Sequence, residues 1–457
     1  MERLFSLVVW LLCVLPVLGQ GIEGMWSGQL EAGPQKLRLV VNITKSASGY
    51  EGTMDSPDQG AKGIPLSSVT YQSPDLMFTI QPLGVVYKGT VSGTRIVGTF
   101  TQSGVSFPLI FTRGGVVVNR PQEPKPPYPY QSENVSFSSQ SPNVRLAGTL
   151  TVPQQNQGKC AAVILVSGSG PQNRDGEIFN HKPFLVIADY LTRNGIAVLR
   201  YDDRGVGGSN GASLALITDD FVRDAHGAFD FLLSRKEIDS ARIGIIGHSE
   251  GGTIAFIAAA QNPKIAFLVS LAGMAIRGDS LMIEQNRDLL LTQGLQVGAV
   301  EPYCRALGKV FEVVKKESPE YIVQNKERIL SEILSEKDMA AVPDPLKQNL
   351  TAVLTTSSTP WMKHLLSLDP TRYIKQVKCR VLALNGTRDL QVNAASNLAA
   401  IEAAFKAGGN KHSLIRKYDG LNHLFQHATT GLPAEYGQIE ETIAPTVLEE
   451  IKTWIKK

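Results

Sequence analysis

The stretch Arg242-Ile-Gly-Ile-Ile-Gly-His-Ser-Glu-Gly-Gly252 decides how the rest of the chain is interpreted. Residues 243–246 form a short apolar run rich in branched side chains, the pattern of a buried parallel strand. The run leads into Gly247-His-Ser-Glu-Gly251, and a segment of small residues with helical character follows. Strand, tight turn and helix are the context of a nucleophile elbow, in which a strained turn holds the Ser249 hydroxyl near the positive end of a helix. The alternative is an ordinary glycine-rich turn.

The composition describes a large chain with little net charge. Of 457 residues, 43% are hydrophobic, enough for a sizeable core and about three structural units. The formal net charge of +3 is dispersed, so nothing favours a nucleic acid or an anionic membrane surface as partner. The sequence carries no signature of a particular oligomeric state.

The first residues differ from the rest of the chain. Residues 4–18 are apolar except for Ser6 and Pro16, and they follow Arg3. This pattern predicts a signal peptide over residues 1–19, a secreted or periplasmic protein, and no stable membrane insertion after cleavage. A membrane anchor is the alternative, but the run is short for a membrane span.

Residues 20–113 read as an all-β accessory domain. Short alternating runs separated by Gly, Ser and Thr are typical of a small antiparallel sandwich or barrel. The segment around Trp26 is similar to the first strand of calycin-like barrels, although any β domain can bury a core tryptophan. The segment lacks histidine, so we expect docking, substrate binding or assembly rather than chemistry. Residues 114–131 include five prolines between Arg120 and Tyr130 and predict a semi-rigid linker.

From residue 132 to residue 457, strands and helices alternate. This alternation predicts a mostly parallel sheet with helices on both faces. The expected strands cover residues 161–166, 196–201, 243–246, 265–271 and 380–385. Residues 275–372, between the last two of these strands, look helical and more polar. An insertion of this length predicts a helical cap over the carboxyl ends of the strands, where open α/β sheets place their sites.

A serine nucleophile needs a base, and the base needs an acid that orients it. A further strand is expected at residues 412–418. Of seven histidines, His423 lies in the loop beyond this strand, and His427 is its competitor. Asp389 follows the strand at residues 381–384. The order Ser249, Asp389, His423 is that of α/β-hydrolases and differs from the chymotrypsin and subtilisin orders.

The same scheme needs two backbone donors for the oxyanion. One is expected from Glu250, which follows the nucleophile, and the other from Gln172 in the glycine-rich loop after residues 163–166. Cys160, Cys304 and Cys379 have neither metal-ligand spacing nor the pattern of a disulfide framework, and we expect buried thiols with at most one bridge. No cofactor and no metal are implied.

Several stretches together carry a family resemblance over residues 131–457. They are Gly168-Ser-Gly-Pro-Gln-Asn-Arg-Asp175, Tyr201-Asp-Asp-Arg-Gly-Val-Gly-Gly-Ser209, Gly247-His-Ser-Glu-Gly-Gly252, Pro360-Trp361, Asp369-Pro370, Leu384-Asn-Gly-Thr-Arg-Asp-Leu-Gln391 and Gly420-Leu-Asn-His423. The region resembles α/β-hydrolase-fold serine carboxylesterases, and is similar to secreted bacterial esterases of the dienelactone-hydrolase-like group. The resemblance implies hydrolysis of a small-molecule ester, with short acyl chains favoured, through an acyl-enzyme and without a cofactor. Enzymes named for dienelactones use cysteine, so the serine here argues against lactone chemistry.

Two other functions are compatible with these residues. A serine peptidase of the prolyl-oligopeptidase or aminopeptidase type shares the fold and the triad, and its amide substrates separate it from an esterase. A non-catalytic binding protein with a hydrolase-like domain is the second alternative, which the complete triad disfavours.

Overall fold

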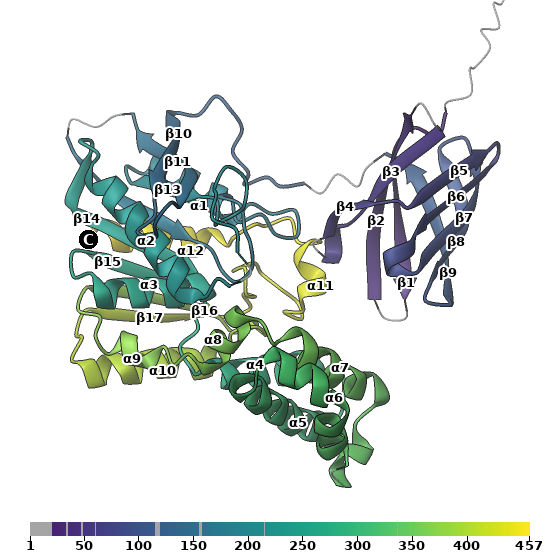
Figure 1. The fold of residues 1–457 in the computed structure, drawn as a ribbon. Coiled ribbons are helices and arrows are strands. Elements are labelled where there is room, and N and C mark those ends of the chain that lie inside the picture. The colour runs from purple at the N-terminus through teal and green to yellow at the C-terminus, as the bar shows by residue number, and fades with distance from the viewer. Residues whose placement is uncertain are drawn as a thin grey trace, which may run out of the picture. The chain divides into compact units, whose positions relative to one another are not determined.

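Two sheets, one in each of two units, organise the chain (Figure 1). The computed structural model describes residues 21–32, 35–46, 49–59, 61–114, 119–154, 158–213, 215–335 and 337–457. The predicted signal peptide at residues 1–19 lies outside them. The two units are Met1–Val117 and Val118–Lys457.

In its described residues, the first unit is a closed antiparallel barrel. The strands run in the order β2-β1-β9-β8-β7-β6-β5-β3-β4, and β2 also pairs with β3, which closes the sheet. Trp26 is fully buried in the interior and donates its indole N–H to the carbonyl of Ile22. The strands are β1 (Gly24–Ala32), β2 (Gln35–Ser46), β3 (Gly49–Ser56), β4 (Ala61–Pro65), β5 (Ser68–Gln72), β6 (Asp75–Ile80), β7 (Val85–Ser92), β8 (Arg95–Gln102) and β9 (Val105–Arg113).

The second unit holds the sheet that positions the site. Its order is β10-β11-β13-β12-β14-β15-β16-β17. The pairs β10–β11 and β11–β13 are antiparallel, and the pairs from β13 to β17 are parallel. This is the mostly parallel sheet that the alternating pattern predicts. The strands are β10 (Tyr130–Ser138), β11 (Arg145–Pro153), β12 (Cys160–Val166), β13 (Ala197–Tyr201), β14 (Ile238–His248), β15 (Phe267–Leu271), β16 (Arg380–Gly386) and β17 (Ser413–Tyr418).

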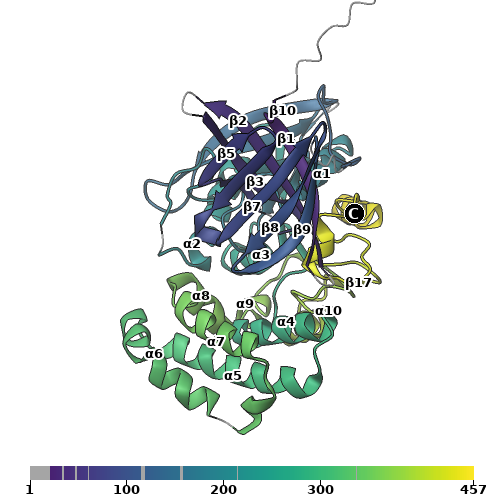
Figure 2. The ribbon, with the colours of Figure 1, turned by 90° about the vertical axis from the view of Figure 1, so that its right-hand side faces the viewer.

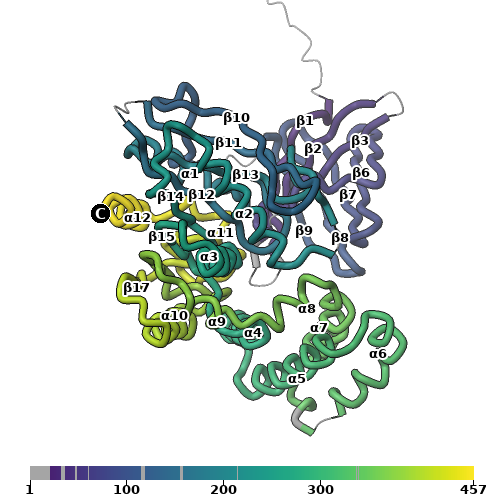
Figure 3. The backbone as a smooth tube through the Cα atoms, turned by 60° about the vertical axis from the view of Figure 1, so that its left-hand side comes forward, coloured from purple at the N-terminus to yellow at the C-terminus, as the bar shows by residue number. Residues whose placement is uncertain are grey.

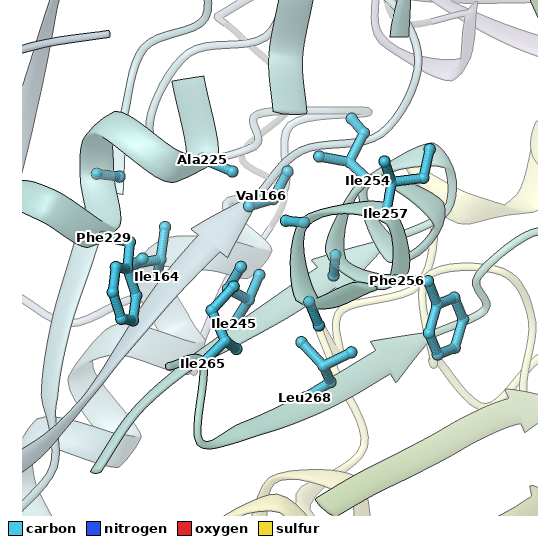
Figure 4. Packing of buried hydrophobic residues seen from close by; sticks show 14 of the residues in the cluster. Ile164, Val166, Ala225, Phe229, Ile245, Ile254, Phe256, Ile257, Ile265 and Leu268 are labelled. Atoms are coloured by element: carbon cyan, nitrogen blue, oxygen red, sulfur yellow. The ribbon is translucent and has the colours of Figure 1, made fainter. Parts of the chain in front are cut away.

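Helices cover both faces of this sheet because its strands alternate side chains between two apolar clusters. Along β12, Ile164 and Val166 enter the core shared with α2, α3 and α10, whereas Val163 and Leu165 enter the core shared with α1 and α12. Figure 4 shows part of the first core, where side chains of α2 and α3 meet those of the strands. The helices are α1 (Pro183–Arg193), α2 (Thr218–Leu233), α3 (Glu250–Gln261), α9 (Thr371–Ile374), α10 (Ala394–Gly408), α11 (Pro433–Tyr436) and α12 (Pro445–Lys456).

Five further helices form an insertion between β15 and β16. Figures 2 and 3 show them as one group beside the sheet, and they share an apolar core of their own. They are α4 (Gly278–Thr292), α5 (Val297–Lys316), α6 (Pro319–Leu334), α7 (Asp344–Thr356) and α8 (Pro360–Ser367). The described helices include none that is long and apolar enough to span a bilayer.

Two sequence features have a definite place in the second unit. The guanidinium of Arg120, in the proline-rich stretch, donates to the carbonyls of Asn180, Gly437 and Ile439, so this stretch is bound to the unit that follows it. The described cysteines form no disulfide; Cys160 and Cys304 are buried and Cys379 is half-buried.

Candidate active site

Ser249 stands at the junction of β14 and α3 in a strained backbone conformation. Its φ of 56° and ψ of −123° lie in a region that residues with a side chain rarely adopt. The strand ends at His248 and the helix begins at Glu250, so the turn consists of the serine itself. This is the strand, turn and helix arrangement that the sequence predicts for an elbow.

The elbow is possible only because its flanking residues lack side chains. A Cβ added to Gly247 would lie 2.0 Å from the carbonyl oxygen of Gly251, and one added to Gly251 would lie 2.2 Å from that of Val166. No rotamer change relieves a clash with backbone atoms.

Gly247→Ala is therefore expected to lower the free energy of unfolding by about 1–3 kcal/mol, the usual cost of overpacking. Urea denaturation measures the change. Gly298→Ala is the matched control, because an added Cβ there meets nothing within 4 Å. Equal stability of the two variants would contradict the tight packing of the elbow.

The structure brings His423 and Asp389 together as the sequence predicts. His423 Nδ1 and Asp389 Oδ2 are 2.8 Å apart, and both residues are buried. The other carboxylate oxygen of Asp389 accepts the backbone N–H groups of Gln391 and Val392, both at 2.9 Å. The carboxylate is thus held in place, and it can fix the imidazole with its Nε2 free to act as a base.

Strand order explains how residues far apart in sequence meet. Ser249 follows β14, Asp389 follows β16 and His423 follows β17, and β14 to β17 are parallel neighbours through β15. Carboxyl ends of parallel strands share one edge of a sheet, which is where such folds place their sites.

The other candidate histidines have different places. His427 is exposed, its Nδ1 lies 2.8 Å from Glu441 Oε1, and it does not line the cavity that contains Ser249. His248 donates its Nε2–H to the carbonyl of His423, and the two rings are 4.7 Å apart. Burial, followed by the nearby His423, lowers the pKa of His248 to about 3, so this ring stays neutral and supports the loop of His423.

The geometry corrects one predicted donor of the oxyanion hole. The N–H of Gln172 donates to Asp203 Oδ2 at 2.9 Å and is therefore already engaged. The same loop approaches the nucleophile at Gly168, where an added Cβ would lie 3.0 Å from the Cβ of Ser249. Within the described part of the chain, the N–H groups of Ser169 and Glu250 donate to no protein acceptor. Ser169 thus replaces Gln172 as the candidate partner of Glu250.

The side chain of Asp203 anchors the loop that follows β12. Its buried carboxylate accepts the hydroxyl of Ser167 as well as the N–H of Gln172. Burial is the largest cause that raises the pKa of Asp203 to about 7. An ionised carboxylate so far from water is costly, and the two donors only partly offset that cost.

Asp203→Asn is expected to change how the free energy of unfolding depends on pH. The unfolded carboxyl titrates at its ordinary pKa of about 4, whereas the folded one titrates at about 7. Between these values the folded protein binds the extra proton, so wild-type stability falls as the pH rises, by at most about 1.4 kcal/mol per pH unit from this group. The variant lacks this slope. Urea titrations between pH 4 and pH 8 measure it, and parallel curves for the two proteins would contradict the assignment.

A cavity of about 330 Å³ contains both Ser249 and His423. The loop after β12 lines one side, and helices α4 and α8 of the insertion line another, with Leu281, Met282 and Trp361. Among the described residues, its lining holds no Asp, Glu, Lys or Arg. The site therefore brings together a serine, a histidine and a buried carboxylate, and among its described lining residues no charged side chain is present to recognise an ion.

Fold and site together define the class of this protein as an α/β-hydrolase. The chain belongs to the family described as "Serine aminopeptidase, S33", whose model matches residues 181–428, more than half of its length. The protein is thus a hydrolase, and the matched region includes Ser249, Asp389 and His423.

Curated relatives agree with this class. The chain is 26% identical to Esterase EstD of Thermotoga maritima over 316 residues, which cover 68% of this chain and 66% of that protein. It is 27% identical to Putative hydrolase YtaP of Bacillus subtilis over 182 residues, 36% of this chain and 58% of that protein. The matches therefore span less than two thirds of either relative. A solved esterase of Pyrococcus furiosus has 16% identity and a TM-score of 0.44, with 75% of this chain and 97% of that one covered, too distant to inform on substrate.

Three contributors to the site were missed from the sequence. The sequence does not identify Ser169, because any of several N–H groups in a glycine-rich loop can point at the oxyanion. The path of the loop determines which of them does so. The carboxyl of Asp203 and the ring of His248 hydrogen-bond to backbone atoms of the site loops. Such a role does not impose a recognisable spacing of residues in the sequence.

Proposed function

We propose that this hydrolase cleaves carboxylic esters through an acyl-serine intermediate. The observation that carries the proposal is the uncharged lining of the cavity that holds Ser249 and His423. A neutral, largely apolar cavity suits a neutral ester, whereas a peptide substrate with a free amine needs a carboxylate to bind its charge.

In the proposed mechanism, Ser249 Oγ attacks the ester carbonyl while His423 takes its proton at Nε2. Asp389 keeps the imidazole in the tautomer that can accept this proton and stabilises the charged ring that forms. The N–H groups of Glu250 and Ser169 hold the oxyanion, and His423 returns the proton to the departing alcohol. Water activated by His423 then releases the acid from Ser249.

An aminopeptidase is the second candidate, because the family description names that activity. Apart from Asp389, the carboxylates of Glu250 and Asp203 contact residues that line the cavity, and both are buried acceptors of protein hydrogen bonds. Neither carboxylate is therefore placed to bind the charged amine of a peptide substrate, which favours an ester substrate over a peptide.

The test compares p-nitrophenyl esters, from acetyl to decanoyl, with leucine p-nitroanilide. We expect Ser249-dependent hydrolysis of the esters, fastest for short chains, and a far lower kcat/KM for the anilide. Faster cleavage of the anilide would establish the aminopeptidase instead. No Ser249-dependent cleavage of either substrate would leave the binding-protein alternative.

Two further parts of the proposal concern the surroundings of the site. We propose that the insertion α4–α8 acts as a cap, since its side chains line the cavity beside the nucleophile. We also propose export, for which the support is the sequence pattern of residues 1–19 alone. N-terminal sequencing of the protein from the producing cell tests the cleavage near Gly19.

A further inference from the structure

A second cavity of about 600 Å³ adjoins the one that contains Ser249. The two cavities share Gly168, in the loop that passes the nucleophile, and Trp361, in α8. Both volumes fall in the range of roughly 300–1,000 Å³ typical of small-molecule sites. No step of the proposed mechanism uses the second cavity.

The free surface of the second cavity is apolar. Its apolar lining includes Tyr201 at the end of β13, Leu216 before α2, Phe221 in α2 and Ile254 in α3. Such a surface gains free energy by covering hydrocarbon, at roughly fourfold in affinity for each methylene buried.

The charged side chains that reach this cavity are Asp203, Arg204 and Glu250, and each has hydrogen-bond partners within the protein. Asp203 accepts from Ser167 and Gln172. Arg204 forms a buried ion pair with Asp224. These groups have hydrogen-bond partners within the protein, so the contacts that remain for a ligand in the cavity are mainly apolar.

Trp361 stands at the junction of the two cavities and is tied to the residue after the nucleophile. Its indole Nε1 lies 3.2 Å from both carboxylate oxygens of Glu250, which also accepts from Ser169 and Thr218. The ring is half-buried and held by one side-chain partner, so it can turn without breaking a backbone bond.

The position of the catalytic groups gives the second cavity a role. A departing alcohol must receive its proton from His423, which lines the first cavity and not the second. Glu250 and Gly168, on the oxyanion side of Ser249, border the second cavity. An acyl chain that is too long for the first cavity can therefore extend past Trp361 into the second cavity.

We propose that the second cavity is a subsite for the acyl chain of longer esters, with the Trp361 ring as the barrier at its entrance. This inference rests on the proposed ester hydrolysis. Short acyl groups occupy the first cavity, and chains of about ten carbons reach Tyr201 and Phe221 when the ring moves aside.

The experiment measures the ratio of kcat/KM for p-nitrophenyl decanoate to that for p-nitrophenyl butyrate. Trp361→Ala should raise this ratio at least tenfold, because it removes the barrier. Adding Ala212→Phe, which places a ring at the wall of the second cavity, should return the ratio to the wild-type value. Adding Ala215→Phe instead should leave it raised, since Ala215 lies in the same loop, is also exposed and does not line the cavity. Melting temperatures identify any variant that misfolds.

Decanoate binding, measured by calorimetry on the same variants, separates this inference from the proposed function. Binding at least tenfold weaker in the Ala212→Phe double variant than in the Ala215→Phe double variant would support the subsite even if no ester were hydrolysed. Ester hydrolysis with an unchanged ratio in Trp361→Ala, or equal ratios and equal binding in the two double variants, would overturn the subsite and leave the esterase standing.

Discussion

Ser249→Ala is expected to lower kcat for p-nitrophenyl butyrate by about 10⁶-fold, the loss typical of removing the serine from a catalytic triad. The hydroxyl is the only atom removed, and the strained φ of 56° and the packing of Gly247 and Gly251 do not depend on it. The variant should therefore fold as the wild type does, with an unchanged circular dichroism spectrum and melting temperature.

Steady-state hydrolysis of the ester, with spontaneous hydrolysis subtracted, measures this loss. Ser169→Ala is a useful companion, because it removes a hydroxyl from the same cavity but keeps the backbone N–H that we assign to the oxyanion hole. It should lose far less activity than Ser249→Ala. Comparable losses in the two variants would mean that the cavity, and not the nucleophile, had been disturbed.

Asp389→Asn is expected to lower kcat by about 10⁴-fold with a much smaller change in KM. An asparagine can direct its carbonyl oxygen at the N–H groups of Gln391 and Val392 only by turning its amide toward His423. The imidazole must then accept at Nδ1, and its proton moves to Nε2, which can no longer take the proton of Ser249.

The control for this variant is Asp419→Asn. Asp419 lies after the neighbouring strand, is exposed, and accepts a hydrogen bond from Thr387 rather than from a histidine. We expect it to retain activity within a few-fold of wild type. A small effect of Asp389→Asn, or a large effect of Asp419→Asn, would move the acid of the triad to the other residue.

The proximity of Ser249, Asp389 and His423 could be predicted from the sequence because each residue follows its own strand. Apolar runs of the kind that buried parallel strands require precede Ser249 and Asp389, and the more polar, partly exposed strand Ser413–Tyr418 precedes His423. Parallel strands bring their carboxyl ends to one edge of the sheet. Position in the chain was thus enough to place these three residues close together.

The remainder of the site depends on contacts that have no sequence period. The choice between Gln172 and Ser169 follows from one hydrogen bond to Asp203, made by a loop whose glycines allow many paths. Closure of the barrel likewise rests on the pairing of β2 with β3, a matter of register and strand twist that alternation alone leaves open. The second cavity arises where α8 meets the loop after β12, elements almost 200 residues apart.

The most direct test of the central claim, that Ser249 is an activated nucleophile, is reaction with a fluorophosphonate followed by peptide mass spectrometry. The geometry predicts one adduct per chain, located on Ser249, with labelling abolished by Ser249→Ala and strongly slowed by His423→Ala. Absence of labelling in the folded wild-type protein, or an adduct on another residue, would contradict the assignment of this site.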